Sequence, residues 1–310
     1  MTRDRSWLLA ILAMAITIVL WASAFVVVRA VGHDYSSGPM ALGRTVVGSL
    51  ALTAIVLIRA VRRRAMPALP KGRQLLIALA WGAAWFGLYN LALNEAEVHL
   101  DAGTTALLVN FAPVLVGVLA GLFLGEGFPA RLMAGLAVAF AGVCLIAAPS
   151  WTGHTNLIGV LLGLAAAVLY AVAAVVQKPL LRSIDALTLT WIGCVIGAIV
   201  CLPFVGGLVH ELGRAPLAST LGVVYLGVFP TAIAFLTWGY ALSRTSAGKL
   251  ASSTYAVPAL VVLVSWFALG EVPAPLAFVG GAVCLVGVAI ATLPRRSRGA
   301  TGAAARQRHS

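Results

Sequence analysis

Long apolar runs dominate the pattern of this chain. Ten of them lie between charged residues, glycine and proline clusters and polar turns, and each is long enough to span a membrane as a helix, which takes about 20 apolar residues. Lipid offers the backbone no hydrogen bonds, so such runs must be helical. The sequence therefore predicts an all-α polytopic membrane protein with ten transmembrane helices. The expected bounds are 7–31, 39–61, 74–94, 102–124, 129–148, 157–180, 186–208, 216–240, 249–269 and 275–293.

The composition excludes other broad classes. Of the 310 residues, 61% are apolar and 10% are charged, and the mean hydropathy is +1.02. A soluble domain carries about 25% charged residues. A disordered chain is therefore excluded and a soluble globular one nearly so. A membrane β-barrel is disfavoured, because its strands alternate over about ten residues whereas these runs are unbroken.

The net charge of +12 reflects membrane topology rather than nucleic-acid binding. With the N-terminus in the cytoplasm, 18 of the 21 lysine and arginine residues fall on the inner side, mostly within 59–73 and 295–308. Cytoplasmic loops are enriched in these residues, so we expect an N-in, C-in topology. Residues 295–310 are predicted to form a disordered, basic cytoplasmic tail.

The N-terminus admits one alternative. Arg3 and Arg5, the apolar run after them and Ala22-Ser23-Ala24 also fit a signal peptide with its cleavage site. The run continues to Val31, however, and an internal repeat passes through the supposed site. We therefore expect the first run to remain a spanning helix.

The internal repeat has a constant offset of 145 residues. Four residues of the first half and four of the second share spacings of 13, 9 and 7: Pro113, Glu126, Gly135 and Gly142, and Pro258, Glu271, Gly280 and Gly287. At an offset of 149, Trp21, Phe25 and Arg29 align with Tyr170, Ala174 and Lys178, each set along one helix face.

The repeat divides the chain into two five-helix halves, residues 1–148 and 149–294. Five is odd, so the halves must enter the membrane in opposite orientations. Such inverted repeats are typical of secondary transporters, with a substrate site near the membrane midplane between the halves. Exchange of roles between similar halves would give alternating access.

The same residues resemble the EamA-type carriers of the drug/metabolite transporter superfamily. The likeness rests on Trp21-Ala22-Ser23-Ala24-Phe25, on Arg44, and on the doubled pattern ending in Gly142-Val143 and Gly287-Val288. It covers about residues 7–293. The acidic segment 95–101 departs from the pattern. The resemblance implies a carrier in the cytoplasmic membrane, often an exporter of amino acids or related metabolites.

Aromatic side chains near the middle of the runs are the first candidates for a substrate site. Tryptophan usually prefers the membrane interfaces, so Trp21, Trp85 and Tyr170 at mid-membrane suggest a cavity lining that stacks on a solute. Phe25 lies on the same helix face as Trp21. The competing interpretation is helix packing or lipid contact, and for Trp85, which belongs to an aromatic stripe, packing is favoured.

Polar groups at mid-depth are the second candidates. Pro113, Pro230 and Pro258 lie inside runs, where proline removes a backbone hydrogen bond and tends to kink a helix. Asn110 and Tyr255 lie beside two of these kinks, and we expect both to line the site. The alternative is that they only bond neighbouring helices.

Charged residues within the runs are candidate gating or structural charges. Arg29, Arg44 and Lys178 are such residues, and intramembrane charges are functional hypotheses by default. Arg29 and Lys178 lie near helix ends and can instead extend to the lipid headgroups. Arg44 can instead pair with Glu95 or Asp101 at the outer surface.

Two glutamates occupy equivalent turns. Glu126 and Glu271 precede the runs 129–148 and 275–293, and we expect each to cap the helix that follows it, where a carboxylate suits the positive helix end. A proton-coupling role is the alternative.

The motifs favour a transporter over an enzyme. The sequence has no HExxH, GxSxG or Walker A motif, and its four cysteines lack the spacing of a zinc site, so no catalytic residue, metal or cofactor is expected. The expected partners are a small-molecule substrate and the lipid bilayer, without nucleic acid; a homodimer is left open. An intramembrane enzyme or a channel is the alternative function.

Overall fold

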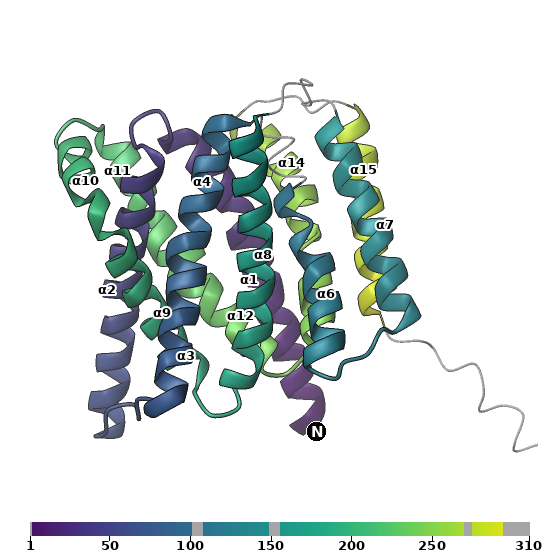
Figure 1. Ribbon diagram of the computed structural model, residues 1–310, viewed down its shortest axis with the longest axis horizontal. Helices are drawn as coiled ribbons and strands as arrows, with labels where there is room; N and C mark the ends of the chain where they lie inside the picture. Colours follow the sequence, from purple (N-terminus) through teal and green to yellow (C-terminus); the bar gives the residue numbers. More distant parts are fainter. Residues whose placement is uncertain (1, 101–107, 149–155, 270–274, 294–310) are drawn as a thin grey trace, which may run out of the picture.

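The computed structural model describes residues 2–100, 108–148, 156–269 and 275–293. Within these ranges every regular element is a helix, and the helices stand side by side as a bundle (Figure 1). The predicted all-α fold is confirmed. The N-terminus and the last turn of α15 lie at the same end of the bundle, which we call the N-terminal end; the other is the opposite end.

The first half of the chain begins with two long helices and continues through a helix interrupted by a π-helical turn. Its elements are α1 (Thr2–Val31), α2 (Ser37–Arg63), α3 (Gly72–Gly82), η1 (Ala83–Leu88), α4 (Tyr89–His99), α6 (Ala112–Phe123) and α7 (Ala130–Ala147).

The second half follows a similar plan with more interruptions. Its elements are α8 (Leu157–Leu180), α9 (Ala186–Cys201), η3 (Leu202–Phe204), α10 (Val205–Leu212), α11 (Leu217–Leu226), η4 (Gly227–Ile233), α12 (Ala234–Leu242), α13 (Ala247–Ser253), α14 (Ala256–Leu269) and α15 (Pro275–Thr292).

Nine helical stretches of the described chain are long and apolar enough to cross a membrane. They match nine of the ten expected runs. The remaining run, 102–124, is described only from residue 108, and its helix α6 is 12 residues long.

Two π-helical turns lie at equivalent positions of the repeat. The turn η1 interrupts the stretch from α3 to α4, and η4 interrupts the stretch from α11 to α12. Residues 83–88 shifted by 145 become 228–233, which falls within η4. Pro230 lies inside η4, where the expected helix distortion is found. Such turns re-aim the side chains that follow them and are frequent at functional sites.

We expected two other prolines to kink a helix, and neither does. Pro113 lies in the first turn of α6 and Pro258 in the first turn of α14. Each helix begins anew after a two-residue turn, at residues 110–111 and 254–255 respectively. A proline in the first turn sacrifices no hydrogen bond, because the first amides of a helix have no partner within it. The distortion is therefore a helix break just before each proline.

The glycines of the repeat pack α7 against α15. A Cβ on Gly142 would lie 2.6 Å from the carbonyl oxygen of Gly280, and a Cβ on Gly135 would lie 2.7 Å from the carbonyl oxygen of Gly287. The later glycine of α7 thus faces the earlier glycine of α15, so the two helices run antiparallel (Figure 1). Only glycine allows the backbones to approach this closely.

Candidate functional site

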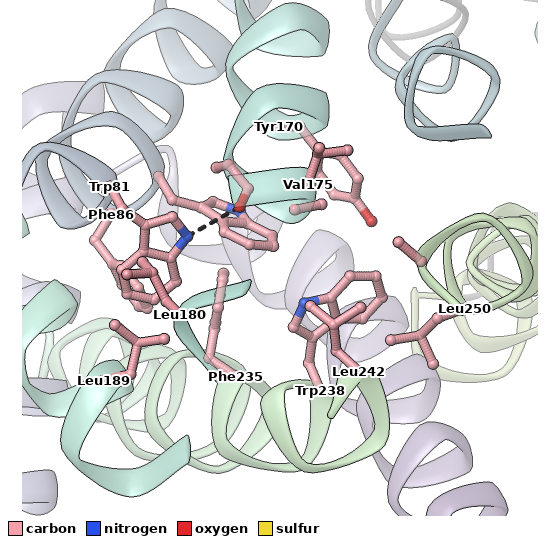
Figure 2. Packing of buried hydrophobic residues seen from close by; sticks show 14 of the residues in the cluster. Trp81, Phe86, Tyr170, Val175, Leu180, Leu189, Phe235, Trp238, Leu242 and Leu250 are labelled. Carbon is pink, nitrogen blue, oxygen red and sulfur yellow. Dashed lines mark hydrogen bonds between the residues drawn. The ribbon is translucent and has the colours of Figure 1, made fainter. Parts of the chain in front are cut away.

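A group of aromatic rings fills the centre of the bundle, with contributions from both halves of the chain. Figure 2 shows part of it, with the rings converging from separate helices. The rings come from α1, η1, α8 and α12. We call them the aromatic cluster: Trp21, Trp85, Phe86, Tyr170, Phe235 and Trp238.

The rings meet mostly edge to face. The Trp21 centroid lies 5.2 Å from that of Trp238 and 5.4 Å from that of Phe235. The Trp85 centroid lies 5.6 Å from that of Tyr170. These separations are those of favourable aromatic pairs, worth about 0.5–1.5 kcal/mol each beyond the area they bury. Trp85 and Trp238 are fully buried, so the aromatic cluster is closed in this conformation.

Two buried polar atoms at the aromatic cluster make no hydrogen bond of ordinary geometry. One is the hydroxyl of Tyr170, and the other is the side-chain Nε2 of Gln177, whose Oε1 accepts a 3.0 Å hydrogen bond from the Trp238 indole. In Figure 2 the Tyr170 hydroxyl points away from Trp81 and toward the helix carrying Leu250. Thr254 is the polar neighbour of the Tyr170 hydroxyl. A buried donor without a good hydrogen bond costs about 1–3 kcal/mol, so both groups could bind a solute favourably.

The structure brings three of the six predicted substrate-binding residues together, namely Trp21, Trp85 and Tyr170. Phe25 is 39% exposed, and its ring makes none of the described aromatic contacts. It lies one turn beyond Trp21 on α1 but turns outward.

Asn110 and Tyr255 meet each other outside the aromatic cluster. The Tyr255 hydroxyl donates a 2.9 Å hydrogen bond to the backbone carbonyl of Asn110. The Tyr255 ring is fully buried in a second, smaller core between α7, α14 and α15. Their hydrogen bond therefore links the two helix breaks, and neither residue belongs to the aromatic cluster.

Sequence reasoning missed Phe235 and Trp238. Their spacing of three residues puts them on one helix face, which was a usable signal. Trp238 stands near the end of the run 216–240, however, where a tryptophan indicates a membrane interface. The helix continues to Leu242 and holds the indole inside the bundle.

The charged candidates occupy three different settings. Arg44, seven residues into α2, donates from Nε to the Thr231 hydroxyl at 3.1 Å. It makes no ion pair with Glu95, whose carboxylate lies 3.5 Å from the His99 ring nitrogen instead. Asp101, the other expected partner, lies outside the described residues. Arg29 lies exposed in the last turn of α1.

Lys178 lies near the end of α8 and binds the end of another helix. Its ammonium donates a 2.6 Å hydrogen bond to the carbonyl of Leu242, the last residue of α12, and a second to the carbonyl of Thr245. A cation is favourable there, because the last carbonyls of a helix lack partners within it and form its negative end.

Glu126 caps a different helix from the one we expected. Its carboxylate accepts backbone N–H groups of Ala247 at 2.6 Å and Gly248 at 3.0 Å, at the start of α13 in the other half. The Ser246 side chain makes no capping bond there, so these amides would otherwise lack a partner. The prediction that Glu126 caps the run 129–148 is wrong. Glu271 lies outside the described residues.

Glu126 and Lys178 together hold the turn between α12 and α13 from both sides. We call this arrangement the end clamp: it joins the loop before α7, the end of α8 and the turn 243–246. The two side chains are close enough to attract each other electrostatically. The end clamp lies at the N-terminal end of the bundle (Figure 1).

A separate cavity of about 520 Å³ opens between α2, α4 and α8 near the opposite end. Four of its nine lining residues are leucines, and it shares no residue with the aromatic cluster. Among the described residues, no group of three histidine, cysteine or acidic side chains could hold a metal ion.

Comparison with known proteins identifies the family. The model of the EamA-like transporter family matches twice, over residues 8–148 and 157–293. The chain belongs to the EamA-like transporter family. The resemblance seen in the sequence is thus confirmed, and the protein is a transporter by family rather than an enzyme.

Relatives extend over nearly the whole chain. A probable terminal-alkyne amino-acid exporter of Streptantibioticus cattleyicolor is 38% identical, covering 94% of this chain and 97% of its own length. An uncharacterized transporter of Bacillus subtilis, YdfC, is 33% identical over 88% of each chain. A probable amino-acid metabolite efflux pump of Escherichia coli is 24% identical over 89% of this chain and 92% of its own length.

A solved crystal structure has the same fold. It aligns with a TM-score of 0.74 at 22% identity, covering 95% of this chain and 99% of that one. At this identity the likeness supports the fold alone.

Proposed function

We propose that this EamA-family transporter exports amino acids or related small metabolites across the cytoplasmic membrane by alternating access. The observation that carries the proposal is the aromatic cluster, in which rings from both halves of the chain meet at the centre of the bundle. A solute bound there would contact both halves, so relative movement of the halves would open it to one side or the other.

An inverted pair of five-helix halves is supported by three observations. The family model matches two separate stretches. The counterpart helices α7 and α15 pack antiparallel through the repeat glycines. The π-helical turns and the helix breaks each occur twice at an offset of 145 residues. In this proposal the halves are residues 1–148 and 149–294.

The excess of lysine and arginine supports a cytoplasmic N-terminal end. The end clamp then lies on the cytoplasmic side, where its Glu126 bonds tie the two halves together. This conformation is therefore the one closed to the cytoplasm. Release of the end clamp would accompany opening toward the cytoplasm to load a compound for export.

The substrate class is supported by chemistry and by kinship. Tryptophan and tyrosine faces stack on apolar or unsaturated side chains. The Tyr170 hydroxyl and the Gln177 Nε2, which make no hydrogen bond of ordinary geometry, offer donors to a polar group. Two relatives carry names of amino-acid exporters or efflux pumps. We therefore propose amino acids with apolar, aromatic or alkyne side chains.

Counterflow in proteoliposomes tests the proposal. Vesicles loaded in turn with unlabelled aromatic, branched, terminal-alkyne and small polar amino acids receive the labelled compound outside. We expect transient accumulation of label for at least one apolar amino acid and at least tenfold slower accumulation with Trp21→Ala or Tyr170→Ala. Trp7→Ala is the matched control, since Trp7 lies on the same helix and is 59% exposed.

Two results would contradict the proposal. Normal counterflow in both cluster variants would place the site elsewhere. A voltage-driven current without counterflow would indicate a channel.

The variant Phe25→Ala tests whether the outward-facing Phe25 ring contributes to transport. Because the ring is exposed, we expect this variant to transport at close to the rate of the unmodified protein.

A further inference from the structure

Arg44 is a half-buried cation, and within the described residues no carboxylate is paired with it. It lies within α2, one of the helices long enough to span the membrane. In the described chain no carboxylate lies within ion-pair distance of its guanidinium, and its only hydrogen bond runs from Nε to the Thr231 hydroxyl. The ionisable groups that act on it most are Tyr89, Cys194 and Cys201. An arginine inside the membrane is costly and calls for a compensating function.

The hydrogen bond to Thr231 uses the Nε atom and leaves the edge formed by the two terminal nitrogens of the guanidinium unused. The two terminal nitrogens, Nη1 and Nη2, make no hydrogen bond within the described chain, and neither is among its enclosed, unpaired atoms. Together they form a planar fork that matches the two oxygens of a carboxylate. The Thr231 bond limits rotation of the side chain, so the fork is held in one direction.

Arg44 lies next to the aromatic cluster, on the side that faces the opposite end of the bundle. Its partner Thr231 precedes the cluster residue Phe235 by four residues, and its neighbour Tyr89 follows Trp85 by four. Four residues are about one helical turn, or 6 Å. Tyr89 also contacts the cluster directly, with 6.1 Å between its ring centroid and that of Tyr170.

We infer that Arg44 binds the carboxylate of the transported compound while the compound's side chain lies against the aromatic cluster. The inference rests on the proposed function and narrows it to amino acids and other organic acids with an apolar body. Thr231 is then a positioning residue that orients the guanidinium. A purely structural arginine that anchors η4 to α2 is the competing account.

Ligand binding to Arg44 variants separates the two accounts. Tryptophan fluorescence can report the binding, because three tryptophans lie in the aromatic cluster. The probes are L-phenylalanine and L-phenylalaninamide, which differ in that a neutral amide replaces the carboxylate. We expect the unmodified protein to bind the acid more tightly. In Arg44→Gln we expect the Kd for L-phenylalanine to rise about 10- to 100-fold, the range of a charge-assisted hydrogen bond, and the Kd for the amide to stay unchanged.

Arg44→Lys keeps the charge but loses the fork, so it should show an intermediate preference for the acid. Arg59→Gln is the matched control: it removes an arginine from the same helix, but one that is paired with Asp185 at the bundle surface. Thr231→Val should weaken binding of the acid less than Arg44→Gln does, because the charge remains.

Each remaining outcome decides a separate point. If the unmodified protein binds both probes equally, or if Arg44→Gln keeps the preference for the acid, the inference is wrong while the proposed function stands. If both Arg44 variants lose the amide along with the acid, Arg44 is structural. If the unmodified protein binds neither probe and shows no counterflow with any amino acid, the proposed function itself fails.

Discussion

The Tyr255 hydroxyl donates a 2.9 Å hydrogen bond to the carbonyl of Asn110, the residue 145 positions before it in the chain. The two residues are counterparts in the repeat, and each lies in the turn that breaks its helix. A second pair behaves alike: the Cys284 thiol donates to the carbonyl of Ala139, also 145 positions earlier. Both contacts join positions that correspond in the sequence repeat, as the proposed arrangement of two similar halves implies.

Removing the Tyr255 hydroxyl tests the value of this contact. Tyr255→Phe keeps the buried ring but leaves the Asn110 carbonyl without this donor, so we expect a loss of about 0.5–1.5 kcal/mol of stability. Thermal unfolding in detergent measures it. Tyr240→Phe is the control, since the Tyr240 hydroxyl makes no described hydrogen bond and its ring is contacted by Arg244. Equal unfolding temperatures for the two variants would show that the contact contributes nothing.

The end clamp predicts a local change in backbone protection. Glu126→Ala removes the acceptor of the Ala247 and Gly248 amides, which have no other described acceptor. We expect these amides to exchange hydrogen for deuterium at least tenfold faster. Hydrogen exchange of the peptide that spans the start of α13, followed by mass spectrometry, gives the rate.

The control for the end clamp is Glu95→Ala, which removes an exposed carboxylate at the opposite end of the bundle. It should leave the exchange of α13 unchanged. Lys178→Met should loosen the same turn from the α12 side, because the carbonyls of Leu242 and Thr245 lose their cation. Unchanged exchange in both clamp variants would mean that packing alone holds the turn.

The helix bounds were predictable because membrane thickness fixes the length of an apolar run. The observed α2, α8 and α15 each end within two residues of the expected position. The doubled glycines were recognised only as a repeat. Their spacing could not reveal that Gly142 and Gly280 face each other, since spacing along a chain carries no information about which helices are neighbours.

The site was only partly predictable for a related reason. Mid-membrane position identified Trp21, Trp85 and Tyr170, because tryptophan and tyrosine in hydrocarbon are unusual. Trp238 was missed because it stands near the end of the expected run 216–240, although the helix continues to Leu242 and keeps the indole inside the bundle. Glu126 was assigned to the helix that follows it because it precedes that helix in the chain, whereas the carboxylate reaches amides 121 and 122 residues further along.

Asp185 predicts a pH dependence of stability. Burial alone would raise its pKa, but hydrogen bonds from Thr188 and Arg59 and the charge of Arg59 outweigh burial and lower the pKa below the ordinary value. A carboxyl whose pKa is lowered by folding stabilises the protein above its unfolded-state pKa. This stabilisation is lost as pH falls through the folded-state value.

The variant Asp185→Asn isolates the charge, because asparagine also caps helices well and should still accept from the Thr188 amide at the start of α9. The side chains are partly exposed, so at neutral pH we expect a loss of only about 0.2–1 kcal/mol. Unfolding temperatures measured from pH 7 to pH 3 should converge as the unmodified carboxyl takes up its proton. A gap that persists at pH 3 would rule out the charge as its cause.

The contact between α7 and α15 predicts that adding one methyl group at Gly142 destabilises the protein, whereas the same change at an uncrowded glycine is tolerated. A Cβ on Gly142 would lie 2.6 Å from the Gly280 carbonyl and from the Cys284 amide nitrogen, both backbone atoms that cannot yield without moving a helix. Overpacking of this kind costs about 1–3 kcal/mol. Gly142→Ala should therefore unfold at a clearly lower temperature and reconstitute poorly.

Gly206→Ala makes the same substitution in α10, where a Cβ meets no atom within 4 Å. Alanine favours a helix interior over glycine by about 0.5–1 kcal/mol, so this variant should be neutral or slightly more stable. The two substitutions thus have opposite expected signs although their chemistry is identical. If Gly142→Ala were as stable as Gly206→Ala, α7 and α15 would have to separate easily, and their contact could not hold the two halves together during transport.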